Sequence, residues 1–202
     1  MSVDIAAIIL AAGRGARYGA AQSKLIADID GVPIIRRVAQ AALASRAARA
    51  VVVTGHAKKE IEAALSGLPV AFVFNPDFAS GLASSLRTGL SAVADADGAL
   101  ALLGDMPGVT PSIIDALIAA FEKEPTSAAV IPTSDGRRGN PVLLSRALFP
   151  QVAMLEGDEG ARKLLRETRG VVELSLDDEG VLADVDTPAD LMRFRRSRYS
   201  RP

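Results

Sequence analysis

The chain contains no cysteine, no tryptophan and a single histidine, His56. Without cysteine it can form no disulfide, no thiolate-bound zinc or iron–sulfur cluster and no thiol nucleophile. One histidine also excludes a multi-histidine metal site, so any metal must be bound by oxygen ligands, which favours Mg²⁺, Mn²⁺ or Ca²⁺. We expect His56, which follows Gly55, to be a loop residue and not a catalytic base.

The sequence also lacks an excess of charge of either sign and any long apolar run. Lys and Arg number 23 and Asp and Glu 24, for a net charge of −1, and aromatic residues make up only 4%. This balance argues against a nucleic-acid partner or a membrane surface. The longest apolar runs, 5–12 and 99–103, are far shorter than a membrane span, and residues 1–10 include Asp4 without a basic start. We therefore expect a soluble, cytoplasmic protein without nucleic-acid or membrane partners.

What is present is a composition that can build a core. The 202 residues are 49% hydrophobic and 23% charged, without a linker rich in Gly, Ser or Pro and without repeats. We expect one domain over residues 1–192 and a basic tail over 193–202, which holds five arginines. The tail is interpreted as a solvated helix end, with contact to an anion or a partner protein as the alternative.

Apolar segments alternate with segments of helical periodicity. The pattern predicts strands at 5–11, 50–53, 70–74, 99–103 and 128–131 and helices at 34–44, 58–65, 80–94 and 111–121. Because the strands are uniformly apolar and separated by helices, we expect an α/β fold with a doubly wound, mostly parallel, Rossmann-like sheet covered on both faces. A small antiparallel addition is expected late in the chain, where the strand at 142–144 could be antiparallel. Further strands are expected at 171–174 and 181–185, before a final helix that begins at Thr187-Pro188.

The loop after the first strand reads Leu10-Ala11-Ala12-Gly13-Arg14-Gly15-Ala16-Arg17-Tyr18-Gly19, with Lys24 soon after. Ligands of open α/β sheets bind beyond the carboxyl ends of strands, where glycine-rich backbone amides can cradle phosphates. Arg17 and Lys24 would add positive charge for a polyphosphate. The glycine spacing fits neither the dinucleotide fingerprint nor the Walker loop, so a plain strand-to-helix turn is the alternative.

Aspartates follow two of the predicted strands. Asp105 comes directly after strand 99–103, where it could hold Mg²⁺ beside a triphosphate, or could be a turn or capping residue. Asp184 and Asp186 lie two apart at the end of predicted strand 181–185, so both could point into one site. The alternative is that Asp186 or Thr187 is the N-cap of the helix that begins at Thr187-Pro188.

Taken together, these motifs resemble the nucleotidyltransferases related to the molybdenum cofactor enzymes, the MobA-like NTP transferase family. The signature loop L-A-A-G-x-x-x-R-x-G is followed by Lys24 and the segment 24–34. The further motifs, in order along nearly the whole chain, are Asn75-Pro76-Asp77-Phe78-Ala79-Ser80-Gly81-Leu82 with Ser84-Ser85, Gly104-Asp105-Met106-Pro107, Gly139-Asn140-Pro141-Val142 and Asp184-Val185-Asp186-Thr187-Pro188-Ala189-Asp190.

The resemblance is strongest to the cytidylyltransferase group, because Ala12 stands where guanylyltransferase relatives typically carry glycine. It implies Mg²⁺-dependent transfer of CMP from CTP to molybdopterin-bound molybdenum with release of pyrophosphate, and Mn²⁺ could replace Mg²⁺. It also implies transient contact with a molybdenum hydroxylase that receives the product.

The resemblance further implies roles for individual residues. Catalysis falls to Arg17, Lys24 and Asp105, and the metal to Asp105 and Asp186, with Asp184 as the alternative second ligand. The nucleotide would contact Leu10, Ala11, Ala12, Gly13, Lys24, Thr54, Asn75 and Asp105, and the acceptor Gly81, Ser84, Ser85 and Asn140. From the residues alone, Thr54 and Asn75 could equally be turn residues, Ser84 and Ser85 ordinary first-turn serines, and Asn140 part of a hairpin turn.

Three other functions remain open from the sequence. The first keeps the reaction but uses GTP or a different phosphorylated acceptor. The second is a non-catalytic, chaperone-like module that binds the cofactor for a molybdenum hydroxylase, although Asp105 and Lys24 are both present. The third is an oxidoreductase on the same fold, for which the glycine spacing supplies no nicotinamide fingerprint.

Overall fold

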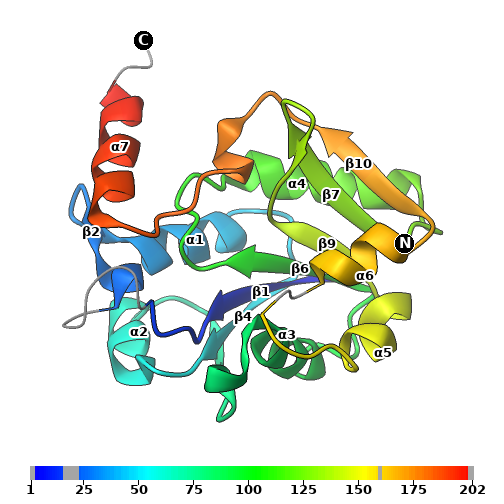
Figure 1. Ribbon diagram of the computed structural model, residues 1–202, viewed down its shortest axis with the longest axis horizontal. Helices are drawn as coiled ribbons and strands as arrows, with labels where there is room; N and C mark the ends of the chain where they lie inside the picture. The colour runs from blue at the N-terminus through cyan, green and yellow to red at the C-terminus, as the bar shows by residue number, and fades with distance from the viewer. Residues whose placement is uncertain (1–2, 16–22, 159–160, 200–202) are drawn as a thin grey trace.

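The computed structural model describes residues 3–15, 23–158 and 161–199. Its centre is one sheet in the order β10-β7-β9-β6-β1-β4-β5, with β8 paired to β7, and a separate β2–β3 hairpin (Figure 1). The strands are β1 (Ile5–Ala11), β2 (Asp28–Ile29), β3 (Val32–Pro33), β4 (Arg49–Thr54), β5 (Ala71–Phe74), β6 (Gly98–Leu103), β7 (Ala129–Ser134), β8 (Arg137–Arg138), β9 (Val142–Ser145) and β10 (Val171–Ser175).

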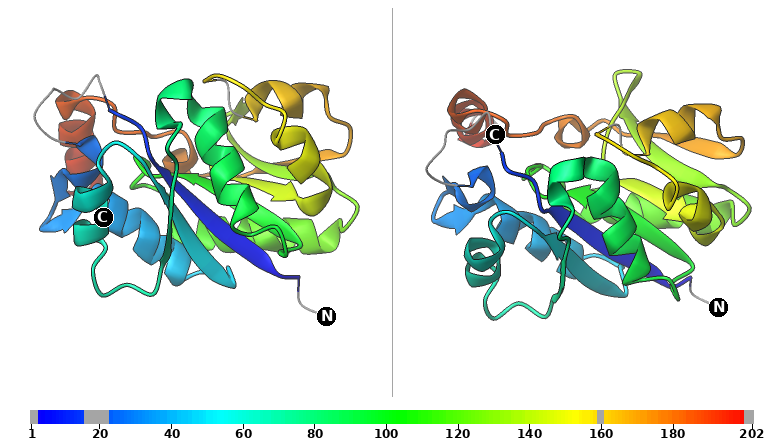
Figure 2. Two further views of the ribbon diagram at one scale, coloured as in Figure 1. Left: turned by 90° about the horizontal axis from the view of Figure 1, so that it is seen from below. Right: turned by 60° about the horizontal axis from the view of Figure 1, so that its bottom comes forward.

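Helices cover both faces of the sheet. The helices are α1 (Ile34–Leu43), α2 (Lys58–Ala64), α3 (Leu82–Ser91), α4 (Pro111–Lys123), α5 (Phe149–Val152), α6 (Arg162–Glu167) and α7 (Pro188–Tyr199), with 3-10 turns η1 (Lys24–Ile26), η2 (Phe78–Ser80), η3 (Arg146–Leu148) and η4 (Glu179–Val181). Figure 2 shows helices on both faces of the sheet. Residues of α1, α2 and α4 share one apolar cluster, and residues of α3, α5 and α6 share the other. Within the described residues, none of these helices is both long and apolar enough to cross a bilayer.

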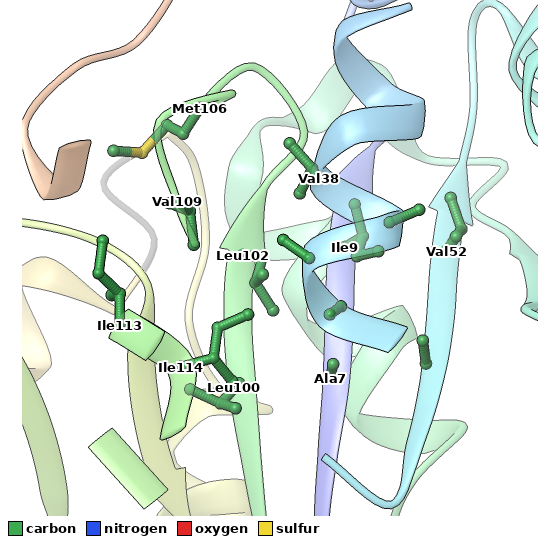
Figure 3. Close-up of a cluster of buried hydrophobic side chains, with 14 of the residues drawn as sticks. Ala7, Ile9, Val38, Val52, Leu100, Leu102, Met106, Val109, Ile113 and Ile114 are labelled. Atoms are coloured by element: carbon green, nitrogen blue, oxygen red, sulfur yellow. The ribbon is translucent and has the colours of Figure 1, made fainter. Parts of the chain in front are cut away.

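Strand β1 lies at the centre of the core because it pairs in parallel with both β4 and β6. Its side chains alternate between the faces: Ala7 and Ile9 pack with Leu100 and Leu102 beneath α1 and α4 (Figure 3), whereas Ile8 joins the cluster with α3. Both faces are apolar because both are covered, which explains why the strand reads as a continuous hydrophobic run.

The structure confirms the predicted fold class. Strands β1, β4, β5 and β6 run parallel, and β9 is antiparallel to both β6 and β7, as expected for the late addition. Helix α7 packs outside the sheet beside the β2–β3 hairpin, where Ile29, Ile34, Val185 and Leu191 form a third apolar cluster.

The predicted strand at 181–185 is wrong. Val181 ends the 3-10 turn η4, and no strand follows it before α7. Val181 and Val185 are both buried, but the segment is held by single backbone bonds to different partners: Asn140 N donates to Val181 O, and Val185 N donates to Asp105 O. The two buried valines therefore hold a loop against the core, and the segment does not pair with a neighbouring strand.

The close packing of α3 on β1 gives a test of the fold. A Cβ at Gly89 would lie 2.4 Å from Ile8 Cγ2 and 3.0 Å from Val53 Cγ2, so Gly89→Ala forces two buried β-branched residues to move. We expect a loss of about 1–3 kcal/mol from overpacking, despite alanine's better helix propensity, and hence a fall in Tm of several degrees. Ser91→Ala on the exposed side of the same helix is the control. An unchanged Tm in Gly89→Ala would contradict the packing.

Candidate functional site

The carboxyl ends of β1, β4 and β6 meet at one edge of the sheet, and a cavity of about 350 Å³ opens there. The end of β1 supplies Leu10 to its wall, and the loop that follows supplies Ala12, Gly13 and Gly15. Lys24, Asp105, Ser85 and the aromatic ring of Phe78 are among its other lining residues. The cavity therefore lies where open α/β sheets bind ligands.

Three of the predicted residues meet in this site. Lys24 Nζ donates to Asp105 Oδ2 at 2.5 Å and to Asp186 Oδ1 at 2.6 Å. Lys24 begins η1, Asp105 follows β6, and Asp186 precedes α7, so the ion pairs join distant parts of the chain. The three side chains are only 12%, 19% and 31% exposed, so solvent screens these interactions less than ion pairs on an open surface.

The glycine loop packs against the stem of the lysine. Gly15 adopts φ +60°, which favours glycine, and a Cβ there would lie 3.3 Å from Lys24 Cγ. A Cβ on Gly13 would meet nothing within 4 Å, so the backbone at Gly13 borders open space at the cavity wall. Arg17, the predicted second cation of the loop, lies outside the described residues.

The burial and the charges of the site shift the pKa values of two residues, Lys24 and Asp184. Burial alone would lower the pKa of Lys24, but the attraction and hydrogen bonds of Asp105 and then Asp186 outweigh it, so the pKa lies above the ordinary 10.5. Burial, followed by repulsion from Asp186 and Asp105, raises the pKa of Asp184 above its ordinary value. The site thus gathers three carboxylates around one ammonium group, and a further cation would relieve their repulsion.

The donor set fits a hard divalent cation. Asp105 Oδ1 is buried and has no hydrogen-bond partner among the described residues, so one oxygen of this carboxylate remains available as a ligand. The residues that the structure describes include no group of three acidic, histidine or cysteine side chains arranged to hold a metal. A metal held by Asp105 and Asp186 would take its other ligands from water and phosphate, which is the usual coordination of protein-bound Mg²⁺.

Several predicted binding residues have their side chains bonded within the protein. Asn75 Nδ2 donates to Ser84 Oγ at 2.9 Å and to Ser85 Oγ at 3.1 Å, and Asp77 N donates to Asn75 Oδ1. Thr54 is fully buried, and its hydroxyl donates to Val73 O at 3.4 Å. The contacts of Asn75 fix the loop after β5 to the first turn of α3, whereas that of Thr54 joins β4 to β5.

The structure places the remaining predicted binding residues as follows. Ser85 and Gly81 line the first cavity, and Ala11 is buried in β1 without lining it. Asn140 lines a second cavity of about 290 Å³, which shares Leu10, Leu82, Leu103 and Asp158 with the first. The assignments of nucleotide and acceptor contacts remain predictions.

Sequence reasoning missed Asp158, Arg162 and Arg166, which the structure brings to the second cavity. Asp158 is the one carboxylate among the described residues that lines both cavities. Its loop is fixed to α3, because Ala83 N donates to Gly157 O at 3.0 Å. The signal available in the sequence was the glycine on each side of an acidic pair in Gly157-Asp158-Glu159-Gly160.

The chain is similar to known proteins in both sequence and fold. The family model of the MobA-like NTP transferase domain matches residues 7–172. Nicotine blue oxidoreductase from Paenarthrobacter nicotinovorans is 30% identical, with 94% of this chain and 96% of that protein covered. The purine catabolism protein PucB from Bacillus subtilis is 34% identical, with coverage of 94% and 95%. The crystal structure of Rv0371c from Mycobacterium tuberculosis in complex with manganese is 27% identical, has a TM-score of 0.80 and covers 96% of this chain and 99% of its own.

Loss of the lysine should expose the repulsion in this site. In Lys24→Met, Asp105 and Asp186 keep their charges without the shared ammonium group, so we expect a loss of about 1–3 kcal/mol, below the value for a fully buried pair because both carboxylates contact solvent. Thermal unfolding should show a Tm several degrees lower. Lys24→Met/Asp105→Asn should recover part of that loss, and Mn²⁺ should raise the Tm of Lys24→Met. If Lys24→Met alone were as stable as the parent protein at neutral pH, that result would contradict this account.

Proposed function

This chain belongs to the family of MobA-like NTP transferase domains, and from that membership we propose that it transfers CMP from CTP to molybdopterin-bound molybdenum and releases pyrophosphate. The observation that carries the proposal is the contact of Lys24 with Asp105 and Asp186 at the carboxyl edge of the sheet. Positive and negative groups lie there together beside a glycine-lined cavity, which is what a metal–triphosphate complex requires.

The reaction demands little covalent chemistry from the protein. A phosphate oxygen of the acceptor attacks the α-phosphorus of CTP in line, and the bond from that phosphorus to the oxygen bridging the α- and β-phosphates breaks. Pyrophosphate leaves with the bonding electrons. The acceptor oxygen is already nucleophilic, so the protein's contribution is positioning and neutralisation of charge. Lys24, together with Arg17 and the amides of the loop after β1, would stabilise the charge that develops on the leaving pyrophosphate.

A divalent metal fits the same residues. Asp105 would hold it through its unpartnered Oδ1, and Asp186 would complete the protein ligands. Bound there, Mg²⁺ or Mn²⁺ would neutralise the phosphates and polarise the α-phosphorus for attack. The manganese complex of Rv0371c supports divalent metal use in this family.

The preference for cytosine rests on Ala12. Its Cβ lies against the loop at Gly55, since a Cβ on Gly55 would come within 2.8 Å of it, and Ala12 lines the first cavity. The methyl group is buried between the loop after β1 and Gly55 behind the cavity wall, and in the proposed reaction this packing would favour a pyrimidine over the larger guanine.

An oxidoreductase is the second candidate, because a relative that matches almost the whole chain is named nicotine blue oxidoreductase. A redox function would leave the buried, unpartnered Asp105 Oδ1 and its neighbouring carboxylates without a use. Transfer of a guanylyl group, and a role as a non-catalytic chaperone that hands the cofactor to a molybdenum hydroxylase, are separated from the proposal by the two experiments below.

Asp105→Asn tests the metal assignment. Pyrophosphate release from CTP, measured with Mg²⁺ and molybdopterin-bound molybdenum, should fall by at least about 10²–10³, while circular dichroism shows an intact fold. Asp177→Asn removes an exposed carboxylate that does not line the first cavity and should leave the rate unchanged. Full activity in Asp105→Asn would refute the assignment, and no release in the parent protein from CTP or GTP would favour the carrier or redox function.

Ala12→Gly tests the base assignment. Removal of one methyl group from a closely packed wall should lower the ratio of kcat/KM for CTP over GTP by about tenfold, near the lower end of the discrimination available from such a group. The measurement is pyrophosphate release with each nucleotide in turn. A parent protein that uses GTP in preference to CTP, or an unchanged ratio in the variant, would overturn the role given to Ala12.

A further inference from the structure

The second cavity has an apolar floor and a cationic side. Its floor is formed by aliphatic side chains from the sheet and from α3 and α6: Leu82, Leu86, Ala101, Leu103, Ile131, Val142, Leu144 and Leu165. Such a surface favours an apolar ring system over a sugar or a bare polyphosphate. The hydrophobic lining alone does not determine which charged groups the ligand carries.

The cationic side comes from α6. Arg162 and Arg166 are four residues apart, so they lie on one side of the helix, and both line the cavity. Neither has an ion pair or hydrogen bond to any of the described residues, whereas the neighbouring Arg138 binds Glu173 at 2.7 Å. Two guanidinium groups that have no partner in the described part of the chain, beside an apolar cavity, are suited to a carboxylate or phosphate.

The two cavities are charged differently. Lys24 and Asp105 line only the first, Arg162 and Arg166 line only the second, and Asp158 lines both. In the proposed reaction the attacking oxygen must reach the first cavity, where the triphosphate lies. An acceptor that extends from there past Asp158 therefore meets the apolar floor and then the arginines with its non-reacting part.

We propose that the second cavity binds the non-reacting part of the acceptor, and that this part combines an apolar ring with a second anionic group that contacts Arg162 and Arg166. The inference rests on the proposed function for the identity of the first cavity, but it concerns different residues. It makes the arginine pair a determinant of acceptor specificity, whereas nucleotide binding is left to the first cavity.

Direct binding tests this without turnover. The probe is 1-naphthyl phosphate, followed by its fluorescence, with CTP present at saturation so that phosphate sites of the first cavity are filled. Neutral 1-naphthol and inorganic phosphate are the matched ligands that carry only the ring or only the anion. The variant is Arg162→Gln/Arg166→Gln, and the control is Lys163→Gln/Arg169→Gln, which removes the same charge from exposed residues that line neither cavity.

We expect the parent and the control to bind 1-naphthyl phosphate about tenfold more tightly than 1-naphthol, as charge-assisted contacts to exposed arginines allow. In Arg162→Gln/Arg166→Gln the two ligands should bind alike, with the affinity for CTP unchanged. Equal binding of both ligands by the parent, or a preference that survives in the arginine variant, would overturn the inference. Failure of the proposed function would appear separately, as the absence of pyrophosphate release.

Discussion

The two ion pairs of Lys24 join three segments that lie far apart in the sequence. They connect the turn after the glycine loop, the end of β6 and the turn before α7, and Val185 N adds a backbone bond to Asp105 O. Because Asp105 and Asp186 repel each other, this arrangement requires a cation between them. The position of the final helix, the opening of the first cavity and the charge of the site all depend on that requirement.

The core explains why the polar groups gather at one edge. Every residue of β1 is buried between two apolar layers, so the interior of the sheet has no place for a charge. Polar chemistry is confined to the residues that follow the strands. Two cavities result, one bordered by Lys24 and Asp105 and the other by the arginines of α6, with Asp158 at their boundary.

The sequence was most informative where one local cause determined the structure. Continuous apolar strands predicted the parallel sheet, and the place of Asp105 directly after such a strand predicted its position in the site. The strand at 181–185 was predicted wrongly because two buried valines there anchor a loop, a tertiary effect. Helix α6 is too short for its periodicity to be read, so Arg162 and Arg166 were missed. The contacts of Asn75 with Ser84 and Ser85 likewise depend on how α3 packs.

The contact between Gly81 and Gly157 restricts how this protein can diverge. A Cβ on Gly81, whose φ is +105°, would lie 2.4 Å from the backbone of Gly157, so neither the conformation nor the space admits a side chain. Any side chain at Gly81 would collide with the backbone of Gly157, so Gly81 cannot be substituted without displacing the loop that carries Asp158. If the second cavity binds the acceptor as proposed, acceptor preference would change more readily by substitutions on α6 and on the aliphatic floor than by substitutions where Gly81 meets Gly157.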